Sequence, residues 1–208
     1  MTHAGGPRVV AVDPVAPTRV TLQAAVDVLR AGGLVAFPTE TFYGLAASAL
    51  DPAAVRRIFE LKGRPESKPL LVLVDSVAMA ETVAHVAEPA RDLMGRYWPG
   101  ALTLVLRARA HVPPDVTARS GTLGLRVSSH PIARGLVEAL GVPVTAPSAN
   151  PNGLAPPTTA AGVLAYFEEG IDLVLDGGPT PGGEPSTVLD MTVEPPRILR
   201  RGAVAVRV

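Results

Sequence analysis

Residues 62–74 read Lys62-Gly63-Arg64-Pro65-Glu66-Ser67-Lys68-Pro69-Leu70-Leu71-Val72-Leu73-Val74, a basic turn followed directly by an apolar run. Between residues 56 and 68, five basic side chains stand against two acidic ones, although the whole chain has 19 of each. Gly63 and the two prolines favour a fixed turn, in which Lys62 and Arg64 would converge on a phosphate or a carboxylate. The same letters are also typical of a solvated surface turn.

The composition predicts one domain in the cytoplasm. A chain of 208 residues with 47% hydrophobic content can form one good core, and no linker or charge block divides it. Balanced charge gives no overall attraction to nucleic acid or membrane, and the lack of cysteine excludes disulfides and thiolate metal sites. No apolar run approaches the roughly 20 residues that span a bilayer, and residues 1–20 lack a signal-peptide core.

Capping residues and apolar spacing predict the secondary structure. Helices are expected after Thr21, after Asp51, after Ser76, at Pro89–Tyr97, at Pro131–Leu140, and from Thr158 to about Glu169. Strands are expected at 34–37, 70–75, 102–107, 122–127, 142–145, 171–175, 186–190 and 197–200, with a short edge strand at 8–12 in a loose arm, residues 1–17. Without a strict βαβ order, these elements favour an α/β fold with a twisted, mixed, open sheet and helices around it over a doubly wound fold.

Two further polar motifs follow expected strands, which is where ligand contacts usually lie. The first is Pro38-Thr39-Glu40-Thr41 with Tyr43 close behind, and the second is Ser148-x-Asn150. In an extended loop, residues two apart point to one side, so Ser148 and Asn150 would face one ligand. Each motif alone also fits a plain turn. Walker, G-x-G-x-x-G, G-x-S-x-G and H-E-x-x-H motifs are absent, so none of those chemistries is indicated.

Taken in order, these motifs resemble the YrdC-type threonylcarbamoyl-AMP synthases, in a short single-domain form. The residues that carry the resemblance are Pro38-Thr39-Glu40-Thr41 with Tyr43-Gly44-Leu45, Lys62-x-Arg64 with Lys68-Pro69-Leu70, Trp98-Pro99-Gly100 before Leu102-Thr103, Arg126, Ser148-x-Asn150, Ser186-Thr187 and Leu199-Arg200. The resemblance implies a YrdC-like domain over residues 18–204 with a concave substrate-binding face.

The resemblance also implies an enzyme that makes threonylcarbamoyl-AMP from ATP, L-threonine and bicarbonate or CO2 and releases pyrophosphate. This is the first step of the threonylcarbamoyladenosine (t6A) modification of tRNA. Mg²⁺ is implied as the ion that accompanies ATP, with no metal ligands expected from the chain. The product would pass to a tRNA threonylcarbamoyl transferase complex. A carbamate attack on phosphorus needs no covalent enzyme intermediate, so positioning and charge neutralisation would supply most of the acceleration.

By the same resemblance, the site residues fall into two groups. The nucleotide and its phosphates are assigned to Lys62, Arg64, Lys68, Thr103, Ser148, Asn150 and Arg200, with Lys62 and Arg64 as catalytic groups on a solvent-accessible loop. L-threonine is assigned to Thr39, Tyr43, Arg126 and Ser186, with Arg126 gripping its carboxylate through a bidentate pair.

The sequence departs from the family pattern at a few positions. Pro156 stands where many relatives have serine, and Leu73 where archaeal and eukaryotic relatives often have histidine. The chain stops near Val208, without the extra domain of longer members, so a lid over the site is expected either to come from its own loops or to be missing.

Two alternatives are an RNA-binding module of the same fold and a paralogue without synthase activity. Few aromatic residues and no net positive charge argue against stable nucleic-acid binding. The retained Lys62-x-Arg64 and Ser148-x-Asn150 pairs argue against the inactive paralogue.

Overall fold

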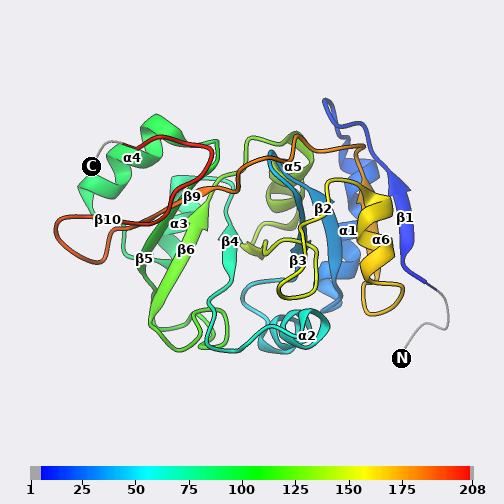
Figure 1. Ribbon diagram of the computed structural model, residues 1–208, viewed down its shortest axis with the longest axis horizontal. Coiled ribbons are helices and arrows are strands. Elements are labelled where there is room, and N and C mark those ends of the chain that lie inside the picture. Colours follow the sequence, from blue (N-terminus) through cyan, green and yellow to red (C-terminus); the bar gives the residue numbers. More distant parts are fainter. Residues whose placement is uncertain (1–5, 207–208) are drawn as a thin grey trace.

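The computed structural model describes residues 6–206, whose strands form two mixed sheets (Figure 1). The smaller sheet has the strand order β1-β8-β2-β3, and the larger has the order β10-β9-β5-β6-β4-β7. The strands are β1 (Arg8–Ala11), β2 (Val35–Pro38), β3 (Tyr43–Ala46), β4 (Leu71–Leu73), β5 (Leu102–Arg107), β6 (Thr122–Arg126), β7 (Val144–Thr145), β8 (Leu173–Asp176), β9 (Thr187–Asp190) and β10 (Arg197–Arg200). The predicted mixed α/β architecture is confirmed, with its strands divided between two sheets.

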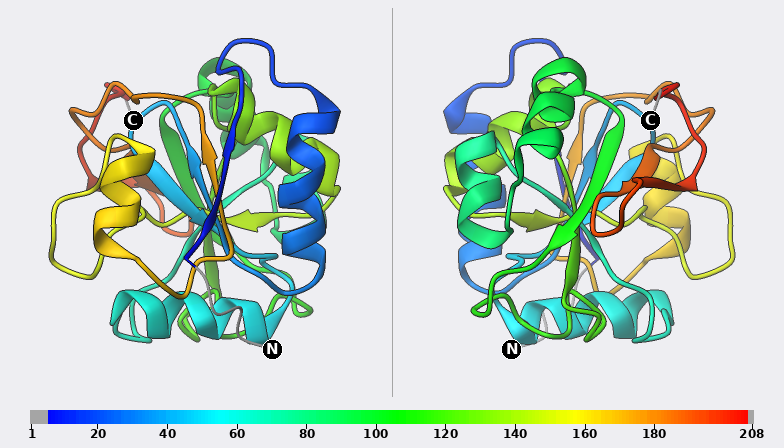
Figure 2. Two further views of the ribbon diagram at one scale, coloured as in Figure 1. Left: turned by 90° about the vertical axis from the view of Figure 1, so that its right-hand side faces the viewer. Right: turned by 90° about the vertical axis from the view of Figure 1, so that its left-hand side faces the viewer.

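Helices cover both faces of the smaller sheet. The helices within residues 6–206 are α1 (Arg19–Arg30), α2 (Pro52–Lys62), α3 (Val77–Val83), α4 (Glu88–Tyr97), α5 (Pro131–Leu140) and α6 (Ala160–Tyr166). Figure 2 shows α1 and α5 together on one side of the smaller sheet and α6 on the other. None of the helices within residues 6–206 has the length and hydropathy needed to cross a bilayer.

The strand β2 lies at the centre of the core because it is buried on both faces. Leu34 and Ala36 pack into one apolar cluster, whereas Val35 and Phe37 pack into a second cluster with α1 and α5. Alternate side chains of a strand point to opposite faces, so a continuous apolar run serves both layers. The carboxyl end of this rigid strand holds the turn that begins at Thr39.

The two sheets meet at β3 and β7. The Thr145 hydroxyl accepts a hydrogen bond from the Ala47 amide at 2.9 Å and donates one to the Leu45 carbonyl at 3.0 Å. Beyond β7, Gly44 and Ser148 form an isolated antiparallel bridge. This junction places the Ser148-x-Asn150 loop directly beside β3.

Local signals located several helix ends correctly. Asp51 caps α2 ahead of Pro52, Ser76 caps α3, and α5 has the predicted bounds. The expected cap at Thr21 is wrong, because Thr18 caps α1 and Thr21 is the third helical residue of the same capping box. Either threonine fits the local rule, and the box uses both.

Other predicted bounds also needed correction. The helix α6 begins after Thr159 instead of Thr158, and it ends at Tyr166 instead of near Glu169. The strand β3 is missing from the predicted strands. The edge strand predicted in the arm is present as β1, which pairs with β8. The first five residues of that arm lie outside the described residues.

Candidate active site

A cavity of about 720 Å³ is lined by residues from both sheets and from the loops that follow β2, α2 and β7. Most of the predicted site residues meet there, although they lie far apart in the sequence. Those that line it are Thr39, Tyr43, Arg64, Thr103, Arg126, Ser148, Asn150, Ser186 and Arg200. Lys62 and Lys68 are not among the lining residues.

Lys62 is the last residue of α2 and is only 4% exposed, so the expectation that it lies on a solvent-accessible loop is wrong. Its ammonium donates hydrogen bonds to the backbone carbonyls of Ser148 and Asn150. Burial, followed by the nearby Arg64 charge, lowers the pKa of Lys62 to about 8. Lys62 therefore fixes the backbone of the Ser148-x-Asn150 loop through these two hydrogen bonds.

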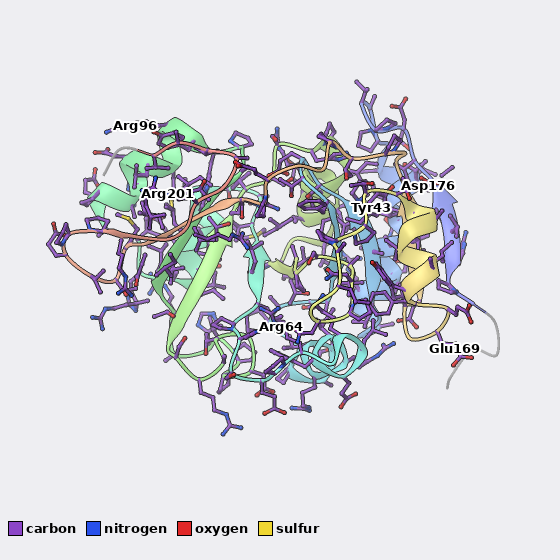
Figure 3. All side chains as sticks on the ribbon, viewed as in Figure 1. Tyr43, Arg64, Arg96, Glu169, Asp176 and Arg201 are labelled. Carbon is purple, nitrogen blue, oxygen red and sulfur yellow. The ribbon has the colours of Figure 1, made fainter. Side chains whose placement is uncertain are left out.

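Arg64 follows the left-handed Gly63 that ends α2, with a φ of 56°. The Arg64 side chain is labelled in Figure 3. Its guanidinium donates hydrogen bonds to the carbonyls of Lys68 at 3.2 Å and Pro69 at 2.9 Å, which closes the basic turn. Burial lowers the pKa of Arg64. Lys68 itself is exposed, so of the two side chains only Arg64 belongs to the cavity wall.

Arg126, at the end of β6, is 3% exposed and forms an ion pair with Glu40, whose Oε1 lies 3.1 Å from Nη1. Burial lowers the pKa of Arg126, and Glu40 opposes that shift. The other carboxylate oxygen of Glu40 accepts a hydrogen bond from the Ser128 hydroxyl. Glu40 and Ser128 were not predicted as site residues, although Glu40 stands inside the motif that contains Thr39.

Where β5, β9 and β10 line the cavity, hydroxyl groups form hydrogen bonds between these strands. Thr103 and Ser186 lie 3.0 Å apart through their hydroxyl oxygens, which joins β5 to the start of β9. Arg200 donates to the Ser186 carbonyl and to the Ser186 hydroxyl, each at 3.0 Å. Burial lowers the pKa of Arg200, and the positive charge of Arg126 adds to that effect. Two guanidinium groups thus raise the local positive potential.

The hydroxyls of Thr39 and Tyr43 are engaged by the fold. Thr39 accepts hydrogen bonds from the amides of Thr41 and Phe42 and donates one to the Phe42 carbonyl at 2.7 Å. Tyr43 donates to the Gly178 carbonyl at 2.7 Å. Burial, reinforced by Asp176, raises the pKa of Tyr43 to about 12, so its phenol stays neutral. Both side chains shape the wall between β2 and β3.

Asn150 offers an unused oxygen at the cavity. Its amide nitrogen donates to the carbonyls of Pro151 at 3.0 Å and Leu154 at 2.7 Å, which fixes its orientation. The buried Oδ1 has no hydrogen-bond partner within residues 6–206. The Asn150 carboxamide and the Ser148 hydroxyl are oxygen groups of the kind that Mg²⁺ accepts, so these two residues would hold the ion, although the sequence predicts no metal ligands from the chain. No three His, Asp or Glu side chains cluster in metal-binding geometry in this part of the chain.

A scan against protein-family models matches residues 27–202 to the Sua5/YciO/YrdC model, which is described as telomere recombination. The chain belongs to the Sua5/YciO/YrdC family. The resemblance drawn from the motifs is therefore confirmed. The match begins inside α1 and ends beyond β10, so it includes every residue that lines the cavity.

Two curated members of this family, both named threonylcarbamoyl-AMP synthase, are similar to the chain. The Pyrococcus abyssi protein is 45% identical over 184 residues, which cover 88% of this chain and 54% of the relative. The Bacillus subtilis protein is 43% identical over 182 residues, which cover 86% and 53%. The chain thus spans about half the length of these relatives.

Solved structures of family members share the fold. Pyrococcus abyssi Sua5 complexed with L-threonine superposes with a TM-score of 0.90 at 43% identity, covering 93% of this chain and 57% of that chain. Escherichia coli YciO superposes with a TM-score of 0.89 at 28% identity, covering 97% and 98%. The described residues therefore have the same fold as a Sua5 that holds L-threonine.

Proposed function

We propose that the protein makes threonylcarbamoyl-AMP from ATP, L-threonine and bicarbonate or CO2 and releases pyrophosphate. The observation that supports this function best is the cavity, where Arg64, Arg126 and Arg200 meet. These guanidiniums come from a loop, from β6 and from β10. A relative with L-threonine bound and curated relatives named for this synthase activity support the same reaction.

The charge of the cavity suits the substrates. Arg64 and Arg200 are held by uncharged acceptors, so each keeps its full positive charge for the phosphates of ATP. Arg126 would bind the threonine carboxylate, because a planar guanidinium pairs with a carboxylate through two hydrogen bonds. Ser148 and Asn150, whose backbone carbonyls are bound by Lys62, would contact the phosphates.

In the proposed reaction the neutral threonine amine adds to CO2, a carbon–oxygen π bond opens, and loss of one N–H proton to solvent leaves a carbamate. A carbamate oxygen then attacks the α-phosphorus of ATP, and the bond from that phosphorus to the bridging oxygen of pyrophosphate breaks. The chain would hold the reactants in line and neutralise the growing negative charge, chiefly through Arg64 and Arg200. Mg²⁺, held by the Ser148 hydroxyl and Asn150 Oδ1, would supply further charge neutralisation on the phosphates.

The product is a reactive mixed anhydride, and we propose that a tRNA threonylcarbamoyl transferase complex consumes it in the cytoplasm as part of t6A synthesis. The two alternatives, an RNA-binding module and an inactive paralogue, predict no product. An RNA-binding module would also be expected to present exposed aromatic and basic side chains over a wide surface.

The test is mass spectrometry of the pure protein mixed with ATP, Mg²⁺, L-threonine and bicarbonate. Threonylcarbamoyl-AMP and pyrophosphate are expected only when all three substrates are present, and omission of Mg²⁺ should reduce the rate. Pyrophosphate released equally fast without threonine would refute the proposal. Arg56→Ala provides a matched control, because this arginine pairs with Asp115 on the surface and does not line the cavity.

A further inference from the structure

Arg126 differs from the other two arginines of the cavity in what holds it. Arg64 and Arg200 donate to backbone carbonyls, and Arg200 also donates to a hydroxyl. Among the three, within residues 6–206, only Arg126 has a carboxylate within 4.0 Å, and that carboxylate belongs to Glu40. The position of one guanidinium is thus fixed by an acid, whereas the other two are fixed by neutral groups.

Glu40 is itself fixed at its second oxygen. The Ser128 hydroxyl donates to Oε2 of Glu40, and the same hydroxyl oxygen accepts a hydrogen bond from the His130 amide at 3.2 Å. That amide occupies a lone pair of Ser128 and leaves the hydroxyl hydrogen for Glu40. His130 caps α5, so the carboxylate is anchored to the start of a helix.

Glu40 contacts Arg126 but does not line the cavity. Thr39, Thr41 and Arg126 line the cavity, but Glu40 does not, and its side chain is 14% exposed. The ion pair brings Nη1 of Arg126 to 3.1 Å from Oε1 of Glu40, but neither that oxygen nor the buried Nε of Arg126 has a hydrogen-bond partner in the described part of the chain. A guanidinium held at one nitrogen, with donors left over, can still pair with a second carboxylate.

We propose that Glu40 is a positioning residue that fixes the Arg126 guanidinium for the carboxylate of the amino-acid substrate. This inference rests on the proposed function, in which Arg126 binds threonine. Glu40 acts through Arg126, because it does not line the cavity. The opposite role would be competition, in which the acid only reduces the attraction of Arg126 for the substrate.

Glu40→Gln separates the two roles, because it keeps the length of the side chain and removes its charge. Positioning predicts that the threonine Kd, measured by calorimetry, rises by roughly tenfold as Arg126 loses its fixed geometry. The ATP Kd measured on the same sample should stay within about twofold, which also shows that the cavity is folded. Competition predicts tighter threonine binding, and that result would overturn the proposal.

Two further variants keep the test valid if Glu40→Gln folds poorly. Ser128→Ala leaves the ion pair in place but removes the anchor of Glu40, so the threonine Kd should rise by a smaller factor. Glu40→Asp keeps the charge but shortens the reach, so weaker threonine binding is expected here too. Full threonine affinity in both variants would show that charge alone matters and would overturn the proposal.

Glu138→Gln is the matched control. Glu138 also pairs with an arginine, Arg134 at 3.6 Å, but on the surface of α5. Its threonine Kd should equal that of the wild type. A wild type that binds threonine with Glu40-dependent affinity but forms no product would refute only the proposed reaction. An active wild type whose threonine Kd is unchanged by Glu40→Gln would refute only the role of Glu40.

Discussion

The ammonium of Lys62 donates a hydrogen bond to the backbone carbonyl of Ser148, 86 residues further along the chain. A second bond reaches the carbonyl of Asn150. The amide of Asn152 in turn donates to the Lys62 carbonyl at 2.8 Å. The end of α2 and the loop after β7 are therefore one structural unit, and changes at Lys62 should be felt at Ser148 and Asn150.

Lys62→Ala should lower turnover by roughly ten- to a thousandfold, the range for loss of a preorganised charged donor. Two carbonyls would lose their donor, so the melting temperature should fall as well. Arg64→Ala should lower turnover by a similar factor with little loss of stability, because Arg64 is only partly buried. Steady-state kinetics with a thermal melt distinguish the two variants. Unchanged turnover in Arg64→Ala would remove its assigned role.

The pKa of Lys62 predicts a pH effect on nucleotide binding. Above pH 8 the folded protein loses the Lys62 charge, so the ATP KM should rise there. Unfolded lysine keeps its proton up to a pKa of about 10.4, so the contribution of Lys62 to folding stability should increase with pH between the two values. Kinetics on either side of pH 8 check the first effect. The same rise in KM in Lys62→Met would assign it to another group.

Arg126→Ala should raise the threonine KM by roughly ten- to a hundredfold, because a charge-assisted bidentate contact is lost. The ATP KM should change much less. Arg126→Lys should restore only part of the affinity, since lysine lacks the planar fork. Initial rates with each substrate varied in turn give both constants. Equal changes in the two KM values would contradict a specific carboxylate contact.

Gly124 lines the cavity and, because it has no side chain, leaves that part of the cavity free for a ligand. It lies on β6 beside Thr103, and an added Cβ would come within 3.3 Å of the Thr103 methyl. Gly124→Val should therefore weaken substrate binding while costing about 1–3 kcal/mol of stability through overpacking. Calorimetry with ATP and threonine tests this. Gly95→Val on α4, where an added Cβ meets nothing within 4 Å, should leave binding unchanged.

Nucleic acid should not occupy the cavity. In the proposed function the basic side chains near it bind one triphosphate and one carboxylate, and the chain has only 4% aromatic residues for stacking on bases. We expect saturable ATP binding and weak tRNA binding that disappears at physiological salt. A titration at that salt showing tight tRNA binding, undiminished by excess ATP and threonine, would favour the RNA-binding module.

Local sequence signals were sufficient for features that depend on neighbours in the chain. Asp51 followed by Pro52 sets the start of α2 because capping and backbone restriction act within a few residues. The motif residues that line the cavity were likewise visible as polar groups at the ends of strands. The resemblance to a family then indicated which of them belong together.

Features that depend on contacts between distant parts of the chain could not be predicted from local sequence signals. The burial of Lys62 comes from carbonyls 86 and 88 residues away, and no local pattern encodes that approach. Glu40 carries no signal of its own, since its pairing with Arg126 appears only when β2 and β6 are folded together. The strand β3 is buried throughout and lacks the alternation of apolar and polar residues that marks a half-exposed strand, so the sequence pattern does not predict it.

Because the cavity wall takes residues from Thr39 through to Arg200, the cavity exists only when nearly the whole chain is folded. Any ligand that binds there stabilises the native state by mass action, by about 2.7 kcal/mol at a concentration one hundred times its Kd. Under the proposed function, nucleotide supply in the cell would therefore influence how long each molecule survives proteolysis. With ATP and threonine as the ligands, a cell short of either would hold less of this protein, even with its synthesis unchanged.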